Sequence, residues 1–373
     1  MKRVPFSEIA EADWDAVCDV SDGAWLFHRH AWISFEAAYA GVENFSFGLE
    51  HGDRLVAVAP LFASRLGLGP FVETLIHDGY HRHTGLAIVP ALDPGEAQAV
   101  RTAWIDAIRE IGTQKDADRI HLACQNLAPS ALSNLRVEIP FWVTEQGFQL
   151  GQGYGPAGIV PAPGLSTVVA DQIVALEHTE DFLFARLKDT CRRAIRKADK
   201  SGAVAEDLTA NADCIETYYS IATLSAARTG EQLPHVDFYR AIHAAQSSRG
   251  RCTLLVVRVN STVAAAAILL HDKGGMYFLS GVSAPAFLDK RVNDFLHWSA
   301  IRMARERGFT HYRLGPYFPT VPKGWPIETV SRFKTKFGAE QRTIVQGSLF
   351  LRPKRYIALA QAHIAQLCED IAG

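Results

Sequence analysis

The sequence predicts an α+β protein of two domains, each a mixed and mostly antiparallel sheet flanked by helices. The 373 residues exceed the ~250–300 at which a single hydrophobic core usually stops growing. Helical and β-rich patterns are interspersed through both halves of the chain. A stretch rich in glycine and proline at 147–164 separates the halves, so we expect one domain at 1–165 and a second at 166–373.

The first half contains four helical patterns and three β-rich runs. Apolar residues recur at helical spacing in 6–20, 30–39, 96–112 and 129–135. The run FSFGLEHGDRLVAVAPLF predicts a hairpin with its turn at His51-Gly52-Asp53, and RIHLA at 119–123 predicts a strand. Gly112 is predicted to end the third helix.

The second half begins with a strand at 166–170 and a basic helix at 179–201. Further helical patterns follow at 211–227, 236–247 and 292–307. The runs CTLLVVRV, TVAAAAILLH and MYFLSG are separated by short turns, which favours an antiparallel meander. The strand HYRLG, a short helix after a proline-rich loop and the strand TIVQGSLFL follow.

The composition is that of a folded globular protein, with 48% hydrophobic and 21% charged residues. The longest apolar run, Val263 to Leu270, is far shorter than the ~20 residues that cross a bilayer, so we expect no membrane span. Acidic residues from Glu8 onward interrupt any secretory signal. The six cysteines form no CxxC pair, which argues against disulfides and a cysteine zinc site. We expect a cytoplasmic protein.

The net charge of −2 conceals a difference between the halves. Residues 1–170 carry 11 Lys and Arg against 20 Asp and Glu, a balance of −9, whereas the remaining residues carry 27 against 20, a balance of +7. Between Phe182 and Val204 alone, seven basic residues stand against two acidic ones. This run is typical of a solvated helix face, but it also suits a phosphate-bearing ligand, for which Arg193 and Lys197 are candidate contacts.

A second cluster follows the strand MYFLSG. The loop SAPAFLDKR leads from this strand to a helix that begins near Val292. Backbone N–H groups at such a helix start bind pyrophosphate, and Lys290 and Arg291 add positive charge. The loop has no glycine fingerprint.

Taken together, these motifs resemble the FemAB-like branch of the GNAT acyltransferase superfamily over about 166–350. The resemblance is carried by RLKDTCRRAIRKADKSG, LSAARTG, MYFLSGVSAPAFLDKRVNDFLHWSAIRMARERGFTHYRLG and RFKTKFG. In the first half, AWISFEAAY and DRLVAVAPLF are similar to the family's N-terminal domain.

The resemblance implies two GNAT-like domains, the first on the acceptor side and the second, with a C-terminal helix, on the donor side. The strands MYFLSG and HYRLG are then adjacent and diverge at their carboxyl ends, where the donor binds. Backbone pairing with pantetheine is expected at Leu279, Ser280 and Gly281. Contacts to pyrophosphate are expected at Lys290, Arg291 and Asn293. Asn293 is alternatively a helix N-cap.

Acyl-CoA is the expected donor co-substrate, because the net charge of −2 and the absence of a helical-hairpin insertion favour a compact donor, and no tightly bound cofactor is expected. Two departures from the family pattern matter. The absent glycine-rich pyrophosphate loop disfavours CoA, and Arg313, which stands where an aspartate is common, bears on the substrate contacts. A FemX-type aminoacyl-tRNA donor is the alternative, although the helical-hairpin insertion of some such enzymes is missing. A catalytically inert protein that binds an anionic ligand is a further interpretation.

Acyl transfer to an amine requires support for an oxyanion and a route for a proton. Lys334 of FKTKFG is the candidate for the first task and Tyr317, just after the strand HYRLG, for the second. Asp294 is a candidate base and His297 an alternative, although such residues on a helix more often cap it or face solvent.

The acceptor is expected to be an amine of a cell-envelope, polysaccharide or amino-acid-like molecule. Candidate contacts are Arg228 of LSAARTG and, in the loop HDGYHRHTG, His77, Tyr80 and His81. The HxxxHxH spacing would bind a metal only if the side chains converged with a second shell, and no fixed element holds them, so no metal is expected. The acyl chain length and the oligomeric state stay open.

Overall fold

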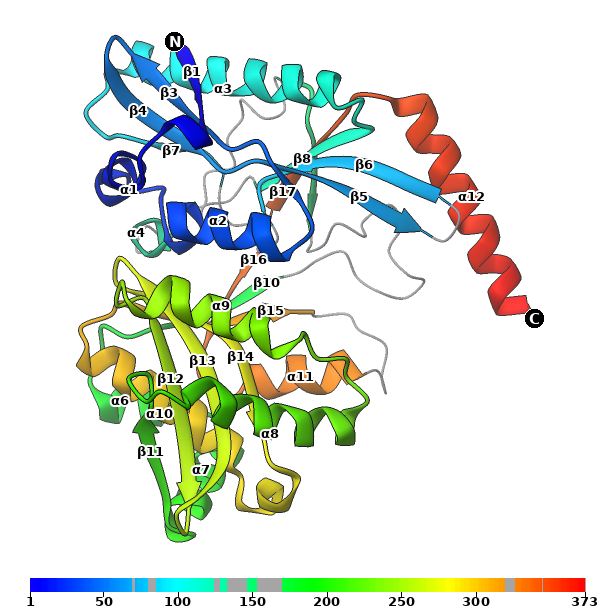
Figure 1. Cartoon of the computed structure of the whole chain (residues 1–373). Coiled ribbons are helices and arrows are strands. Elements are labelled where there is room, and N and C mark those ends of the chain that lie inside the picture. Colours follow the sequence, from blue (N-terminus) through cyan, green and yellow to red (C-terminus); the bar gives the residue numbers. More distant parts are fainter. Residues whose placement is uncertain are drawn as a thin grey trace. The chain divides into compact units, whose positions relative to one another are not determined.

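The computed structural model divides the chain into two compact units (Figure 1). It describes residues 1–68, 71–79, 85–123, 128–132, 146–152, 170–318, 326–343 and 345–372. The first unit contains Met1–Val169, Phe318–Pro322 and Thr343–Gly373. The second contains Ala170–Tyr317 and Lys323–Arg342.

The first unit is built on two sheets. The four-stranded sheet has the order β1 (Lys2–Pro5), β3 (Phe47–His51), β4 (Arg54–Ala59) and β7 (Ala87–Ile88). The six-stranded sheet has the order β2 (Glu43–Asn44), β5 (Phe62–Leu68), β6 (Phe71–His77), β8 (Arg119–Ala123), β17 (Val345–Phe350) and β9 (Gln149–Gln152). The predicted hairpin is confirmed, because β3 and β4 pair antiparallel around Gly52.

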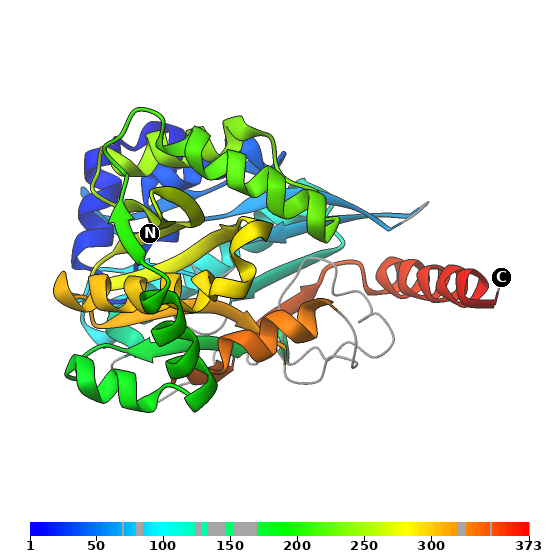
Figure 2. The same cartoon turned by 90° about the horizontal axis from the view of Figure 1, so that it is seen from below.

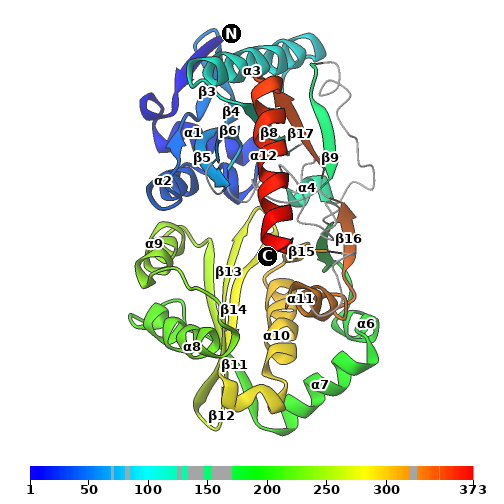
Figure 3. The ribbon, with the colours of Figure 1, turned by 90° about the vertical axis from the view of Figure 1, so that its right-hand side faces the viewer.

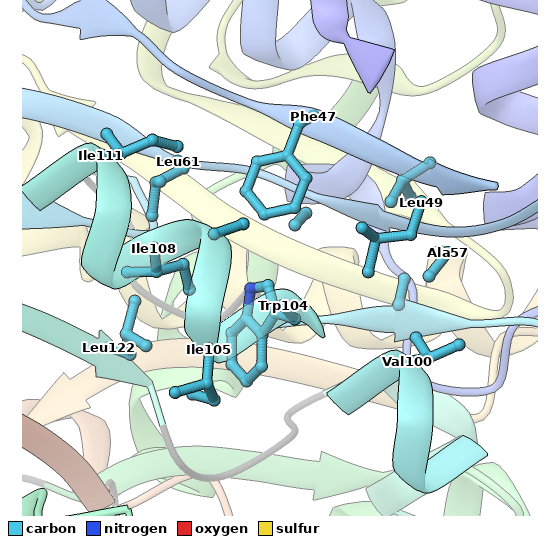
Figure 4. Close-up of a cluster of buried hydrophobic side chains, with 14 of the residues drawn as sticks. Phe47, Leu49, Ala57, Leu61, Val100, Trp104, Ile105, Ile108, Ile111 and Leu122 are labelled. Atoms are coloured by element: carbon cyan, nitrogen blue, oxygen red, sulfur yellow. The ribbon is translucent and has the colours of Figure 1, made fainter. Parts of the chain in front are cut away.

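Helices flank these sheets and supply much of the core. They are α1 (Glu11–Val20), α2 (His30–Tyr39), α3 (Pro94–Gln114), α4 (Pro129–Leu132) and α12 (Pro353–Ala372). Asp93 starts α3, since its carboxylate accepts the N–H of Glu96, whose side chain reaches back in a capping box. Trp104 and Ile108 of α3 then pack with Phe47 of β3 in the buried cluster of Figure 4. α12 starts beside β6, and its later turns extend away from that sheet (Figure 2).

The second unit is one seven-stranded sheet with helices on both faces. The strand order is β11 (Ala203–Asp207), β12 (Cys252–Val259), β13 (Thr262–Asp272), β14 (Gly275–Ser283), β15 (His311–Tyr317), β10 (Ala170–Ala175) and β16 (Glu340–Thr343). The helices are α6 (Glu180–Arg186), α7 (Asp189–Lys200), α8 (Cys214–Thr229), α9 (Val236–Ser247), α10 (Val292–Glu306) and α11 (Pro326–Lys334), with the 3-10 helix η3 (Pro285–Lys290). α8 and α9 cover one face, and α7, α10 and α11 cover the other (Figure 3).

Several sequence predictions about element boundaries are wrong. The predicted helix 6–20 is a 3-10 helix, Phe6–Glu8, followed by α1. α3 does not end at Gly112 but runs to Gln114; a Cβ at Gly112 would collide with Leu351, so glycine is required there for packing and not to end the helix. The predicted helix 179–201 is two helices, since Leu187 and Lys188 are extended and the Lys188 N–H donates to the Lys336 carbonyl oxygen at 3.0 Å. The predicted strand TIVQGSLFL is confirmed as β17, which pairs with β8 and β9 in the first unit, whereas β16 just before it joins the second unit's sheet.

The pairing of β17 also changes the domain division. The sequence places the whole segment after residue 165 in the second domain, whereas Thr343–Gly373 belongs to the first unit. Backbone hydrogen bonds join β17 to β8 in the six-stranded sheet. The hydrophobic pattern of a strand indicates which of its faces is buried but not which strand it pairs with. Most of the glycine-rich stretch lies outside the described residues, apart from 147–152, where β9 forms.

Candidate active site

The sheet of the second unit opens between β14 and β15. These strands are parallel neighbours whose registered pairs end at Tyr277 and Arg313. Beyond this point β14 remains paired with β13, while β15 continues antiparallel to β10. The backbone edge of Phe278–Ser283 that faces β15 therefore has no strand partner in β15. The predicted adjacency and divergence of the strands MYFLSG and HYRLG are confirmed.

A β-bulge lies on β14 at the start of this opening. Phe278 pairs with Leu269 and Ser280 with Ile268, so Leu279 is the extra residue. The Ser280 hydroxyl accepts a hydrogen bond from the Tyr218 hydroxyl at 2.7 Å. The bulge thus interrupts the ladder at Leu279, one of the residues predicted to pair with pantetheine, while Ser280, another of them, stays paired with Ile268.

Gly281, the third residue of that prediction, is an exposed position that leaves no room for a side chain. A Cβ at Gly281 would collide with the ring of Phe278. That ring packs against His297 of α10, with 4.5 Å between ring centroids. Glycine is therefore required here for the packing of Phe278, and it also leaves the strand edge bare.

The start of α10 faces a basic hollow of about 350 Å³. Its lining residues come from α7, the α10 start and the FKTKFG motif; they are Thr190, Arg193, Ala194, Lys197, Arg291, Asp294 and Lys336. A second hollow of about 200 Å³ shares Arg291, Asp294 and Lys336 with the first and is also lined by Asn293 and Phe333. The first N–H groups of an α-helix have no intrahelical partner and carry partial positive charge, so an anion is stabilised here. The structure thus brings Arg193 and Lys197 to the predicted pyrophosphate contacts.

The turn that leads into α10 forms without a glycine-rich loop because Arg291 adopts the backbone conformation that a glycine would otherwise supply. Its backbone is left-handed, with φ 63° and ψ 32°, a conformation that glycine adopts freely and other residues rarely adopt. The Asn293 side chain donates to the Ser283 hydroxyl at 3.1 Å, and Asn293 follows Arg291, the N-cap residue, rather than capping the helix itself. Lys290 pairs with the adjacent Asp289 at 3.3 Å and does not line either hollow.

The FKTKFG motif packs against the start of the basic helix α7. Gly338 has φ +71°, and a Cβ there would lie 3.1 Å from the Arg186 carbonyl oxygen. Lys188 contacts the motif twice, through its N–H to the Lys336 carbonyl and through Nζ to the Thr335 hydroxyl. Two motifs that are far apart in the sequence therefore form one structural element beside α10.

Lys334 lies at the carboxyl end of β15, beside the opening. Its Nζ donates to the Pro316 carbonyl oxygen at 3.0 Å and lies 3.3 Å from the position that a Cβ would take on Gly315. Burial lowers the pKa of Lys334 to about 8, and the carboxylate of Asp171 opposes this shift. At pH 7 the group is mostly an ammonium, and a partly desolvated cation stabilises a nearby negative charge more strongly than one in water.

The buried pair Asp171 and Arg313 lies on the two strands beside Lys334. Arg313 of β15 donates to Asp171 of β10, and its guanidinium is 5.1 Å from the centre of the Tyr277 ring. Both side chains are almost fully buried. Arg313, which stands where the family commonly has an aspartate, therefore links β15 to β10 at the point where β14 separates from β15.

Asp294 and His297, the two candidate bases, are both engaged with neighbouring side chains. The Asp294 carboxylate is buried and pairs with Lys336 Nζ at 2.5 Å, at the basic hollow and not at Lys334. The His297 Nδ1 is 2.9 Å from the Tyr312 hydroxyl, and burial lowers the pKa of His297 to about 3. His297 is a neutral core histidine.

The remaining predicted residues are dispersed. Tyr317 is the half-buried last residue of β15, and Arg228 is exposed in the last turn of α8. In the first unit, His77 is buried and its Nδ1 accepts the Gly79 N–H at 3.1 Å, so it supports the loop base instead of facing solvent. Tyr80 and His81 lie outside the described residues.

Sequence reasoning missed Lys336, which contributes to both hollows, and the buried polar residues of β10. Lys336 is two residues after Lys334 in the same motif, but only the fold reveals that Asp294 is its partner. Within the described ranges, no three His, Cys, Asp or Glu side chains converge as a metal site. No helix among the described residues is both long and apolar enough to cross a bilayer.

Comparisons with known proteins agree with this geometry. Residues 185–322 match the family described as an acetyltransferase (GNAT) domain. A structure of FemX superposes with a TM-score of 0.71 at 16% identity and covers 96% of this chain and 100% of its own. A search of curated proteins by sequence gave no significant match.

Two further solved structures are similar over almost the whole chain. The C-terminal domain of a putative lysylphosphatidylglycerol synthetase from Agrobacterium fabrum has a TM-score of 0.56 at 13% identity, covering 95% of this chain and 97% of its own. A tandem GNAT protein from the clavulanic acid biosynthesis pathway has a TM-score of 0.50 at 11% identity, covering 94% and 98%. At such identities the likeness establishes the fold. Residues 185–322 of the second unit are therefore similar to a GNAT acetyltransferase domain, and the chain as a whole has a tandem-GNAT-like fold that matches FemX over nearly its full length.

Proposed function

We propose that the chain is an N-acyltransferase that moves an acyl group from acyl-CoA to an amine of a cell-envelope, polysaccharide or amino-acid-like acceptor. One observation carries this proposal: an unpaired strand edge at Leu279–Gly281 and a basic hollow at the start of α10 lie at the two ends of one segment. The first suits the amides of pantetheine, which can add to a strand edge, and the second suits pyrophosphate.

The proposed chemistry is a nucleophilic substitution at the thioester carbonyl. The neutral amine attacks the carbonyl carbon, a C–N bond forms, and the π electrons move to the oxygen. The C–S bond then breaks, the carbonyl reforms, the thiolate takes a proton and the nitrogen loses one. The Lys334 ammonium would stabilise the oxyanion, and Tyr317 would protonate the leaving thiolate. Asp294 would hold Lys336 toward the phosphates, given their ion pair.

An aminoacyl-tRNA donor is a second candidate, favoured by the exposed cations of α7 that lie outside the hollow. Arg196 and Lys200 are exposed and line neither hollow, so they would be available to a larger polyanion. The likeness to FemX is compatible with this candidate. The two donors therefore differ in how much of α7 they would use.

Two double variants of α7 with the same loss of charge separate these donors. We expect Arg193→Ala/Lys197→Ala to weaken CoA binding by at least about tenfold, because charge-assisted hydrogen bonds contribute ~1.5–3 kcal/mol each. The matched control Arg196→Ala/Lys200→Ala should change CoA binding less than about threefold, as expected for exposed charges. Isothermal titration calorimetry measures both, and acetyl-CoA with a panel of amines, followed by thiol release, tests transfer.

The same variants are titrated with charged tRNA across a salt series. A tRNA donor predicts equal losses for both double variants and a slope of about 0.7–0.9 log units of affinity per phosphate neutralised. Tight, strongly salt-dependent tRNA binding without CoA binding would contradict the CoA proposal.

A further inference from the structure

Gln172 of β10 is a fully buried side chain whose carboxamide has no hydrogen-bond partner among the residues that the structure describes. Neither its oxygen nor its nitrogen is bonded, and the residue has no exposed surface. Burying an unsatisfied polar group costs about 1–3 kcal/mol, so such a group in a native strand calls for an explanation. A ligand that completes its hydrogen bonds is one explanation that the neighbouring residues support.

Gln172 faces the same side of the sheet as Lys334. Its alternate neighbour on β10, Val174, belongs to the core beneath α7 and α10, which also contains Phe337 of the FKTKFG motif. The strand partner of Gln172 across the ladder is Gly315, and a Cβ placed on Gly315 would lie next to Lys334 Nζ. The ladder shifts register just after this pair, because Ile173 pairs with Arg313 and Leu314 is the extra residue of β15.

Gly315 leaves room for the Lys334 ammonium. A Cβ placed on Gly315 would have one atom within 4 Å apart from its own chain neighbours, and that atom is Lys334 Nζ at 3.3 Å. Gly315 has φ +85°, a conformation that disfavours any replacement by a larger residue. The ammonium of Lys334 and the strand partner of an unpartnered amide thus meet at Gly315, near the carboxyl end of β15 and beside the opening from β14.

We propose that the Gln172 Nε2–H and the Lys334 ammonium together bind the carbonyl oxygen of the transferred acyl group above Gly315. This inference rests on the proposed function, which supplies the acyl donor. In the substitution described above, the C–O bond becomes a single bond and its oxygen takes up the electron pair. Two converging donors would hold that oxygen, and Gln172 would be a catalytic residue as well as Lys334.

The chain offers a matched control. Gln246 in α9 is also fully buried with both amide atoms unpartnered, but it lies on another element, on the opposite face of the sheet. Gln172→Met and Gln246→Met remove the same group while keeping an unbranched side chain. Neither change should lower the melting temperature, because each removes an unsatisfied amide. Gln172→Leu is the second variant if the methionine variant does not fold.

The experiment compares the binding of acetyl-CoA with that of CoA, which lacks the thioester carbonyl of the acetyl group. We expect the ratio of their dissociation constants to move against acetyl-CoA by about 3- to 10-fold in Gln172→Met, as for one lost hydrogen bond, and to stay unchanged in Gln246→Met. With ¹³C-labelled acetyl-CoA, the infrared carbonyl band should lie at lower frequency in wild type and Gln246→Met than in Gln172→Met.

Each result has a definite meaning. An unchanged ratio and an unchanged carbonyl band in Gln172→Met, with CoA bound normally, would overturn the role of Gln172 and leave the proposed function intact. Wild-type protein that binds neither CoA nor acetyl-CoA would refute the proposed donor, and this inference with it.

Discussion

Replacing Lys334 by Met should leave the protein less active and change how its stability depends on pH. Lys334 has a pKa of about 8 in the folded chain against 10.5 for an unperturbed lysine, because burial disfavours the ammonium. Between these values the unfolded state holds a proton that the folded state has released. Wild-type stability must therefore rise with pH through this window, and Lys334→Met lacks that contribution.

The magnitude follows from the two pKa values. Each unit of difference is equivalent to ~1.36 kcal/mol, so the penalty for the buried ammonium is about 3 kcal/mol at pH 7 and about 1 kcal/mol at pH 10. The variant also leaves the Pro316 carbonyl oxygen without its donor, which costs about 1–3 kcal/mol at every pH. The pH-dependent part is thus a gain for wild type of about 2 kcal/mol between pH 7 and pH 10.

Urea unfolding of both proteins at pH 7, 8, 9 and 10 measures this difference. Contributions from other titrating groups cancel in the comparison, and Lys197→Met, at an exposed lysine of α7, is the control that should show no such trend. A difference in unfolding free energy between wild type and Lys334→Met that stays constant across the series would refute the buried ammonium and its role beside Gly315.

Two further predictions test the packing around the site. Gly338→Ala should destabilise the fold by about 2–3 kcal/mol and Gly230→Ala by only about 1 kcal/mol, because both glycines have positive φ but only Gly338 is crowded by the Arg186 backbone; equal shifts in thermal unfolding would contradict the crowding. Since His297 has a pKa of about 3 when folded against 6.5, wild type should lose about 3 kcal/mol between pH 7 and pH 4 that His297→Phe does not lose. Denaturant titrations at both pH values check this, and parallel pH profiles would show that His297 is not buried and neutral.

Periodicity and turn signals predicted most of the local structure, because they report which face of an element is buried. The helix at 30–39, the hairpin around Gly52 and the meander of β12, β13 and β14 follow from such patterns. The break at Leu187 did not follow from them, since it is fixed by a hydrogen bond from Lys188 to a motif almost 150 residues later. The pairing of β17 is equally a matter of tertiary contact.

In the candidate site, too, some residues could be predicted from the sequence and others only from tertiary contacts. The sequence pointed to Arg193, Lys197 and Arg291 as cations for phosphate, and the fold gathers them around one hollow. It gave no reason to select Gln172, because two adjacent polar residues in a short strand, Asp171 and Gln172, have no recognisable spacing. Its significance depends on Gly315 and Lys334, which only the sheet register brings near it.

The central claim is that one segment from β14 to α10 binds an acyl-CoA donor, and a crystal structure with CoA bound tests it most directly. We predict the pyrophosphate at the amides of Val292 and Asn293 within reach of Arg193 and Arg291, and the pantetheine beside the free edge of β14 at Leu279–Gly281, with its sulfur toward Lys334. CoA bound elsewhere on the second unit, with this edge and the basic hollow both empty, would contradict the account.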